Sequence, residues 1–173
     1  MAWVPPQPRE FLDTVAGRLA NDGFRVQRNV VAGPYSLDTL ASRTGEKKVM
    51  WGGTPIAFSE AVAVSSVQVL GPDDVRNYSS FVAKYALENH SLHAHWTGLS
   101  TVAAVVSPSF GDDAKEWVSE TTPEFSNLFW ARAQFPVLVE LDNREIIYPK
   151  RGPRNQGPLF ENLRYLADEW FGF

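Results

Sequence analysis

Residues 61–70 read AVAVSSVQVL, the most strand-like run in the chain, and residues 71–75 that follow read GPDDV. β-Branched residues favour strands, and a run that is apolar at most positions is typical of a strand buried on both faces. A Gly-Pro pair then ends the strand, and the two acids after it suit the positive end of a helix dipole. This stretch predicts a central buried strand that leads directly into a helix.

The sequence on either side alternates between helical and strand patterns. Apolar residues at helical spacing predict further helices at residues 9–20, 112–119 and 159–170. Apolar runs bounded by turn residues predict further strands at residues 24–31, 35–42, 47–51, 101–106, 128–132, 135–141 and 144–148. Gly33-Pro34 and Asp142-Asn143 predict two antiparallel hairpins, the second with a two-residue turn. The expected fold class is therefore α/β, with a mixed central β-sheet flanked by helices on both faces.

The composition is that of one globular domain. The chain has 173 residues, of which 44% are hydrophobic and 21% charged, enough to build a sizeable core. No internal repeat or linker is visible, so we expect a single domain over residues 1–173. The net charge of -4 disfavours non-specific attraction to nucleic acid. The chain has no cysteine, which excludes disulfides, thiolate metal sites and thiol nucleophiles.

The N-terminal sequence MAWVPPQP does not resemble a secretory signal, because no basic segment precedes an apolar one. No run approaches the roughly 20 apolar residues of a membrane span. These features predict a cytoplasmic protein without a membrane partner.

Three stretches carry a resemblance to a known superfamily: Gly23-Phe24-Arg25-Val26, the predicted strand Ser36-Leu37-Asp38-Thr39-Leu40-Ala41, and AVAVSSVQVLGPDDV at residues 61–75. Together they resemble the PD-(D/E)XK restriction-endonuclease-like superfamily. TVAAVVSPSFGDDAKEWV at residues 101–118 is similar to the next strand and helix of that superfamily. The resemblance covers most of residues 9–141 and implies a restriction-endonuclease-like arrangement of the sheet.

The resemblance also implies a site with two acids and a lysine, in which the acids hold Mg²⁺ and activate a water for phosphodiester hydrolysis. Asp38 matches the first acid by position. Ser66 stands where the second acid belongs and Gln68 where the lysine belongs, so the motif is degenerate. Glu60, on the approach to the central strand, and Glu10, on the first helix, are candidates for a migrated second acid.

Asp38 also has a purely structural interpretation. An acid beside a turn often caps a backbone group or pairs with a nearby cation, here Arg43 or Lys47. Both interpretations remain open from the sequence.

All three histidines lie within six residues, at His90, His93 and His95. On a strand His93 and His95 would share a face, a spacing that allows imidazole nitrogens to hold Zn²⁺. Glu88 or His90 is then a candidate third ligand. The alternative is an exposed strand or loop edge whose imidazoles form local hydrogen bonds.

A polar loop near the C-terminus carries Lys150, Arg151 and Arg154, which are candidates for phosphate contacts. The alternative is a solvated basic loop. The terminal Trp170-Phe171-Gly172-Phe173 either closes the core or docks on a second copy or a partner.

The leading functional hypothesis is a nuclease-like domain with an inactive site that acts as a binding or assembly module for nucleic acid or protein. The enzymatic alternative is an active Mg²⁺-dependent nuclease with a migrated second acid. A third possibility is an unrelated α/β domain whose strand order is coincidental.

Overall fold

The computed structural model describes residues 6–48, 55–66, 71–89, 97–123, 125–126, 132–152 and 157–173. The elements follow one another in the order α1 (Pro8–Asn21), β1 (Arg25–Ala32), β2 (Tyr35–Lys48), β3 (Pro55–Ser65), α2 (Pro72–Asn89), β4 (Thr97–Ser107), α3 (Asp112–Glu120), β5 (Phe125–Ser126), β6 (Arg132–Glu140), β7 (Glu145–Ile147) and α4 (Gly157–Phe171).

Within the described residues the strands form one seven-stranded mixed sheet, in the order β1-β2-β3-β4-β6-β5 with β7 paired to β6. β1, β2 and β3 are an antiparallel meander. β3, β4 and β6 run parallel to one another, and the connections that reverse the chain between them contain α2 and α3. The prediction of an α/β fold with a mixed sheet is confirmed.

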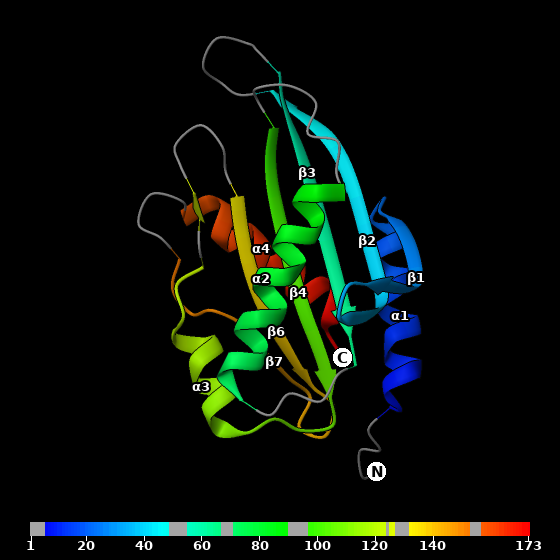
Figure 1. Cartoon of the computed structure of the whole chain (residues 1–173), viewed down its shortest axis with the longest axis vertical. Coiled ribbons are helices and arrows are strands. Elements are labelled where there is room, and N and C mark those ends of the chain that lie inside the picture. Colours follow the sequence, from blue (N-terminus) through cyan, green and yellow to red (C-terminus); the bar gives the residue numbers. More distant parts are fainter. Residues whose placement is uncertain are drawn as a thin grey trace.

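Helices cover both faces of this sheet, α1 and α4 on one face and α2 and α3 on the other (Figure 1). The side chains of β3 alternate between the two cores, since Val62 and Val64 pack with α1 and α4 while Ala63 packs with α2. This alternation follows from the two-residue period of a strand. Residues 61–65 are all buried, so the prediction of a central strand covered on both faces is confirmed. Each fully buried aliphatic side chain contributes about 1.5–3 kcal/mol.

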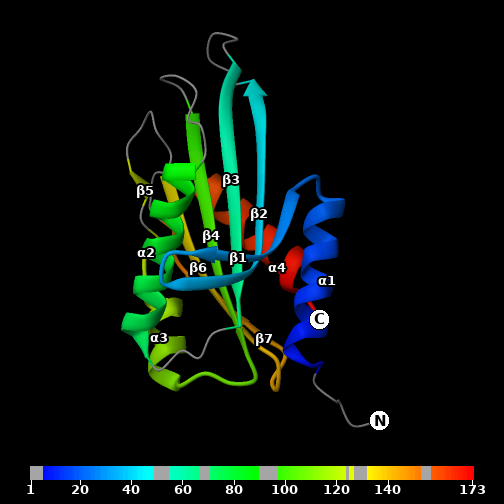
Figure 2. The same cartoon turned by 45° about the vertical axis from the view of Figure 1, so that its right-hand side comes forward.

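The hairpin between β1 and β2 leaves the plane of the sheet and lies against α2 (Figure 2). Asn29 bends β1 with a positive φ of 53°. Gly33, at the turn, also has a positive φ, and a Cβ there would lie 3.2 Å from the Phe81 ring. Tyr35 packs its ring at 5.3 Å from that of Tyr78 and at 4.7 Å from that of Phe81. β2 pairs with β3 only from Thr39 onward, so Asp38 lies just outside that ladder.

The predicted and observed elements differ in several places. Residues 35–42 and the beginning of 47–51 were expected as separate strands, but they form the single strand β2, which pairs with β3 without interruption from Thr39↔Val64 to Lys48↔Pro55. The continuous ladder holds the polar residues between the two apolar runs in strand conformation.

The second hairpin does not have the predicted two-residue turn. Pairing ends at Glu140↔Glu145, so four residues form the turn. The reason is tertiary, because the N–H groups of Leu141 and Asp142 donate to Ser107 O and Pro108 O at the end of β4. These bonds hold Leu141 and Asp142 against the end of β4, so the chain reverses into β7 only after them.

The aromatic C-terminus contributes to the core. Trp170 and Phe171 are buried, and the Trp170 ring meets the Phe24 ring edge-on at 5.3 Å. Phe173 is 44% exposed and packs one side on Phe11. An interaction with a second copy through this end stays a prediction, with Phe173 as its exposed member.

None of the helices in the described part of the chain is both long enough and apolar enough to cross a membrane.

Candidate functional site

Asp38 and Ser66 are brought together where β2 and β3 separate. The last paired residues of the two strands are Thr39 and Val64, so the backbone of Ser66 has no ladder partner on β2. The Asp38 carboxylate takes that place. Its Oδ2 accepts a 2.6 Å hydrogen bond from the Ser66 N–H and a 2.9 Å bond from the Ser66 hydroxyl. Asp38 therefore caps a backbone group, as its structural interpretation expects.

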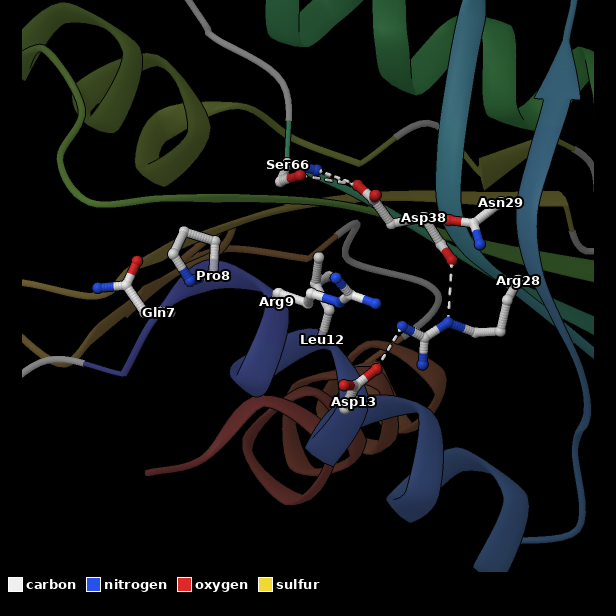
Figure 3. Close-up of a pocket in the computed structure, with 9 residues that line it drawn as sticks. All are labelled: Gln7, Pro8, Arg9, Leu12, Asp13, Arg28, Asn29, Asp38 and Ser66. Carbon is white, nitrogen blue, oxygen red and sulfur yellow. Dashed lines mark hydrogen bonds and ion pairs between the residues drawn. The ribbon is translucent and has the colours of Figure 1, made fainter.

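A pocket of about 650 Å³ opens beside this pair (Figure 3). α1, the β1–β2 hairpin and the end of β3 surround it. Its described lining residues are Gln7, Pro8, Arg9, Leu12, Asp13, Arg28, Asn29, Asp38 and Ser66. The lining thus contains two arginines and two aspartates, and its other polar side chains are uncharged.

Arg28 connects the hairpin to α1 across the pocket. Its Nη2 lies 2.6 Å from Asp13 Oδ1, and its Nε donates to the Asp38 backbone carbonyl at 3.2 Å. The guanidinium is therefore fixed by contacts on two elements. Both side chains of the ion pair are at least one-third exposed, so the pair contributes little to stability by itself.

Arg9 differs from Arg28 in that no acid in the described part of the chain pairs with it. It is exposed at the beginning of α1, and Figure 3 shows its side chain extending from the helix into the pocket. Arg9 is therefore a cation that a ligand can reach without breaking an ion pair with a described residue.

On the α2 face of the sheet, the chain buries a tyrosine next to the Asp38 strand. Ser65 Oγ and Tyr78 Oη are 2.9 Å apart, and Ser65 also donates to Ser36 O. Burial raises the pKa of Tyr78 far above its ordinary value of 10.0. Tyr78 therefore stays protonated and anchors the hairpin to α2.

Glu60 lies in a different network on the α1–α4 face. It is 7% exposed and forms an ion pair with Arg43 across the β2–β3 ladder. Arg43 also reaches Asp22, at 3.3 Å from Oδ2, and stacks 4.3 Å from the Phe24 ring centroid. Glu60 does not line the Asp38 pocket. Its contacts tie β2 and β3 to the turn after α1.

Glu10 is exposed in the first turn of α1. It is not among the described residues that line the pocket, although its neighbour Arg9 is. The helix thus presents a cation, rather than the expected acid, toward Asp38.

Lys150 and Arg151 are exposed after β7. The Lys150 N–H donates to Ser119 O at the end of α3, and neither side chain lines the Asp38 pocket. Arg154, Gln68, His93 and His95 lie outside the described residues.

The described residues do not fit the metal centre that the superfamily resemblance implies. That centre requires a second acid beside Asp38. Here Ser66 binds Asp38 Oδ2, and the other described acid of the pocket, Asp13, forms an ion pair with Arg28. The described part of the chain also contains no group of three or more His, Asp or Glu side chains placed to hold a metal.

The pocket contains functional groups that the sequence interpretation did not include, namely Arg9, Asp13, Arg28 and Asn29. Signals for them were present. Arg9 and Asp13 are four residues apart and so share a helix face. A hairpin turn at Gly33-Pro34 places Arg28 opposite Thr39, the neighbour of Asp38.

Comparisons of the chain with protein-family models, curated proteins and solved structures found no match.

Proposed function

We propose that this domain binds single-stranded nucleic acid through the Asp38 pocket without hydrolysing it. The observation that carries the proposal is that one pocket contains both a cation that a ligand can reach, Arg9, and a carboxylate with one engaged oxygen, Asp38. The resemblance to the restriction-endonuclease-like superfamily supports the same class of ligand.

A nucleotide needs both kinds of group. Its phosphate accepts hydrogen bonds from guanidinium groups, and Arg9 and Arg28 supply them. Its base or sugar donates hydrogen bonds, and Asp38 Oδ1 can accept them. The hydrogen bonds from Ser66 engage only Oδ2, and Oδ1 has no partner among the described residues. The volume of about 650 Å³ lies within the range of ligand pockets. A mixed-charge pocket of this kind fits a nucleotide better than it fits a simple anion.

Binding without cleavage follows from the position of the acids. A two-acid metal centre requires a second carboxylate beside Asp38. Ser66 lies there at hydrogen-bond distance, and the other described acid of the pocket, Asp13, forms an ion pair with Arg28. Glu60 is held by Arg43, away from the pocket. The groups that remain at the pocket bind and orient a ligand.

The net charge of -4 limits the interaction to a few local contacts. Two neutralised phosphates on a single strand give a slope of log affinity against log salt of about -1.4. We therefore expect modest affinity and weak salt dependence, unlike a protein that tracks the backbone with a long basic face.

The test is fluorescence anisotropy of labelled single-stranded and double-stranded oligonucleotides with the full chain. Arg9→Ala and Arg28→Ala are each expected to lower the affinity for the single strand about tenfold, because each removes one charge-assisted contact. Arg25→Ala is the matched control. Arg25 lies on the same strand as Arg28 and its loss changes the net charge equally, but it does not line this pocket.

Equal weakening by Arg25→Ala and Arg9→Ala would mean general electrostatic attraction and would refute the proposed site. Lack of measurable binding to either form at low salt would refute the proposal altogether. Urea denaturation of each variant separates lost binding from lost folding.

A further inference from the structure

A second, smaller pocket of about 210 Å³ lies on the opposite face of the sheet, between α2 and α3. Its floor is β6, and its walls are α2 and the end of α3. The described lining residues are Arg76, Ser79, Ser80, Trp117, Thr121, Thr122, Pro123, Gln134 and Pro136. None of these residues is acidic, and most carry a hydrogen-bonding side chain.

Ser79 is the residue that points to a ligand. It is only 5% exposed, and it lines the pocket. A serine hydroxyl can both donate a hydrogen bond to a ligand and accept one from it. On the wall of a pocket, this hydroxyl is therefore available to a bound polar group.

Arg76 supplies the charge. Its guanidinium carbon lies 5.4 Å from the Trp117 ring centroid. The indole of Trp117, on α3, therefore makes a cation–π contact with Arg76, on α2. Its acid partner is Asp73, one turn earlier, at 3.0 Å. The Asp73 side chain is 85% exposed, so this pair is weak and a ligand can displace it.

Gln134 and Pro136 complete the floor. Both lie in the part of β6 between the residues that pair with β5 and those that pair with β7. Pro136 has no N–H to offer a strand partner there, and the Gln134 amide is half-buried at the pocket. The floor therefore adds an amide donor to the hydroxyls of the walls.

From this set of groups we infer that the α2–α3 pocket binds a phosphate or sulfate group. Arg76 provides the counter-charge, and Ser79, Thr121 and Gln134 provide donors for its oxygens. The volume accommodates the oxyanion with a small substituent or a few waters. This site does not depend on the Asp38 pocket, because the two share no lining residue.

The test uses the indole N–H resonance of Trp117 in the ¹⁵N-labelled full chain, assigned by its loss in Trp117→Phe. Titration with inorganic phosphate, with sulfate and with phosphoserine is expected to move this resonance to saturation. Sodium chloride at matched ionic strength is expected to leave it in place. A stronger effect of phosphoserine than of phosphate would identify a phosphomonoester, and equal effects would identify the free anion.

Two variants test the residues. Arg76→Gln is expected to weaken phosphate binding at least about tenfold, and Ser79→Ala about threefold, in line with one charged and one neutral hydrogen bond. Arg25→Ala is the control and is expected to leave the titration unchanged, because Arg25 lines neither this pocket nor the Asp38 pocket. The inference would be overturned if phosphate did not move the Trp117 resonance, or if it moved that resonance equally in Arg76→Gln and in the parent chain.

Discussion

Asp38 and Ser66 are joined by two hydrogen bonds that converge on one carboxylate oxygen, at 2.6 Å from the Ser66 N–H and 2.9 Å from its hydroxyl. The residue that the superfamily resemblance places at the first acid thus contacts the residue that it places at the second. The contact satisfies a backbone group that β2 leaves unpaired when it bends away from β3. One carboxylate oxygen remains to face the pocket.

This relationship predicts unequal effects of the two truncations. Asp38→Ala is expected to lower the free energy of unfolding by about 1–2 kcal/mol, because both bonds are lost. Ser66→Ala keeps the backbone bond and is expected to cost about 0.5–1 kcal/mol. Urea denaturation measures both, and the double variant gives their coupling. Equal costs would mean that the backbone bond contributes nothing.

Glu140 is expected to make stability depend on acid pH. It is 1% exposed and accepts hydrogen bonds from Lys115 Nζ, Asn143 Nδ2 and the Phe110 N–H. Burial alone would raise the pKa of Glu140, but these bonds outweigh burial and hold the pKa below its ordinary value of 4.5. A lowered folded-state pKa gives stability that is present above pH 4.5 and is lost as pH falls through the folded value.

Glu140→Gln tests this dependence. The variant is expected to lose about 2–3 kcal/mol at neutral pH, since it removes the charge from these bonds. Its urea midpoint should then change less than that of the parent chain between neutral pH and pH below 4.5. If the urea midpoint of Glu140→Gln fell with pH as steeply as that of the parent chain, the acid dependence would come from other carboxylates.

Thr39 offers a stabilising substitution next to the site. It is fully buried, and its Oγ1 has no hydrogen-bond partner among the described residues. Valine has nearly the same shape without the hydroxyl, so Thr39→Val is expected to raise the free energy of unfolding by about 1 kcal/mol. The urea midpoint measures the gain. A loss instead would reveal a partner for the hydroxyl.

The ion pair of Glu60 with Arg43 is expected to be structural. Glu60→Ala leaves Arg43 half-buried without its main partner and is expected to cost about 3 kcal/mol. Oligonucleotide binding by the remaining folded protein should stay at the parent level, because Glu60 lies outside the Asp38 pocket. Affinity that falls with Glu60→Ala in a fully folded sample would instead place Glu60 at the ligand.

The nuclease alternative has its own test. Incubation of supercoiled plasmid with the full chain and Mg²⁺ or Mn²⁺ is expected to produce no more nicking than Asp38→Ala produces. The reason is that the described carboxylates of the pocket are engaged by Ser66 and Arg28. Nicking that disappears in Asp38→Ala would restore the metal-dependent hypothesis.

Local pattern was enough to predict most elements. The AVAV run became β3 and the GPDD run began α2, because a buried strand and a helix start each have a strong local signature. Local pattern did not predict the single long β2 or the four-residue turn before β7, because tertiary hydrogen bonds decided both.

By itself, therefore, the sequence determined the fold class, the central strand and the position of one acid inside the sheet. Only the tertiary structure decided what surrounds that acid. The bend at Asn29 and the approach of α1 bring Arg9, Arg28 and Asp13 to Asp38, while Arg43 keeps Glu60 elsewhere. The reason is physical: periodicity and turn chemistry act over a few residues, whereas the charges around a carboxylate come from elements that pack together across the chain.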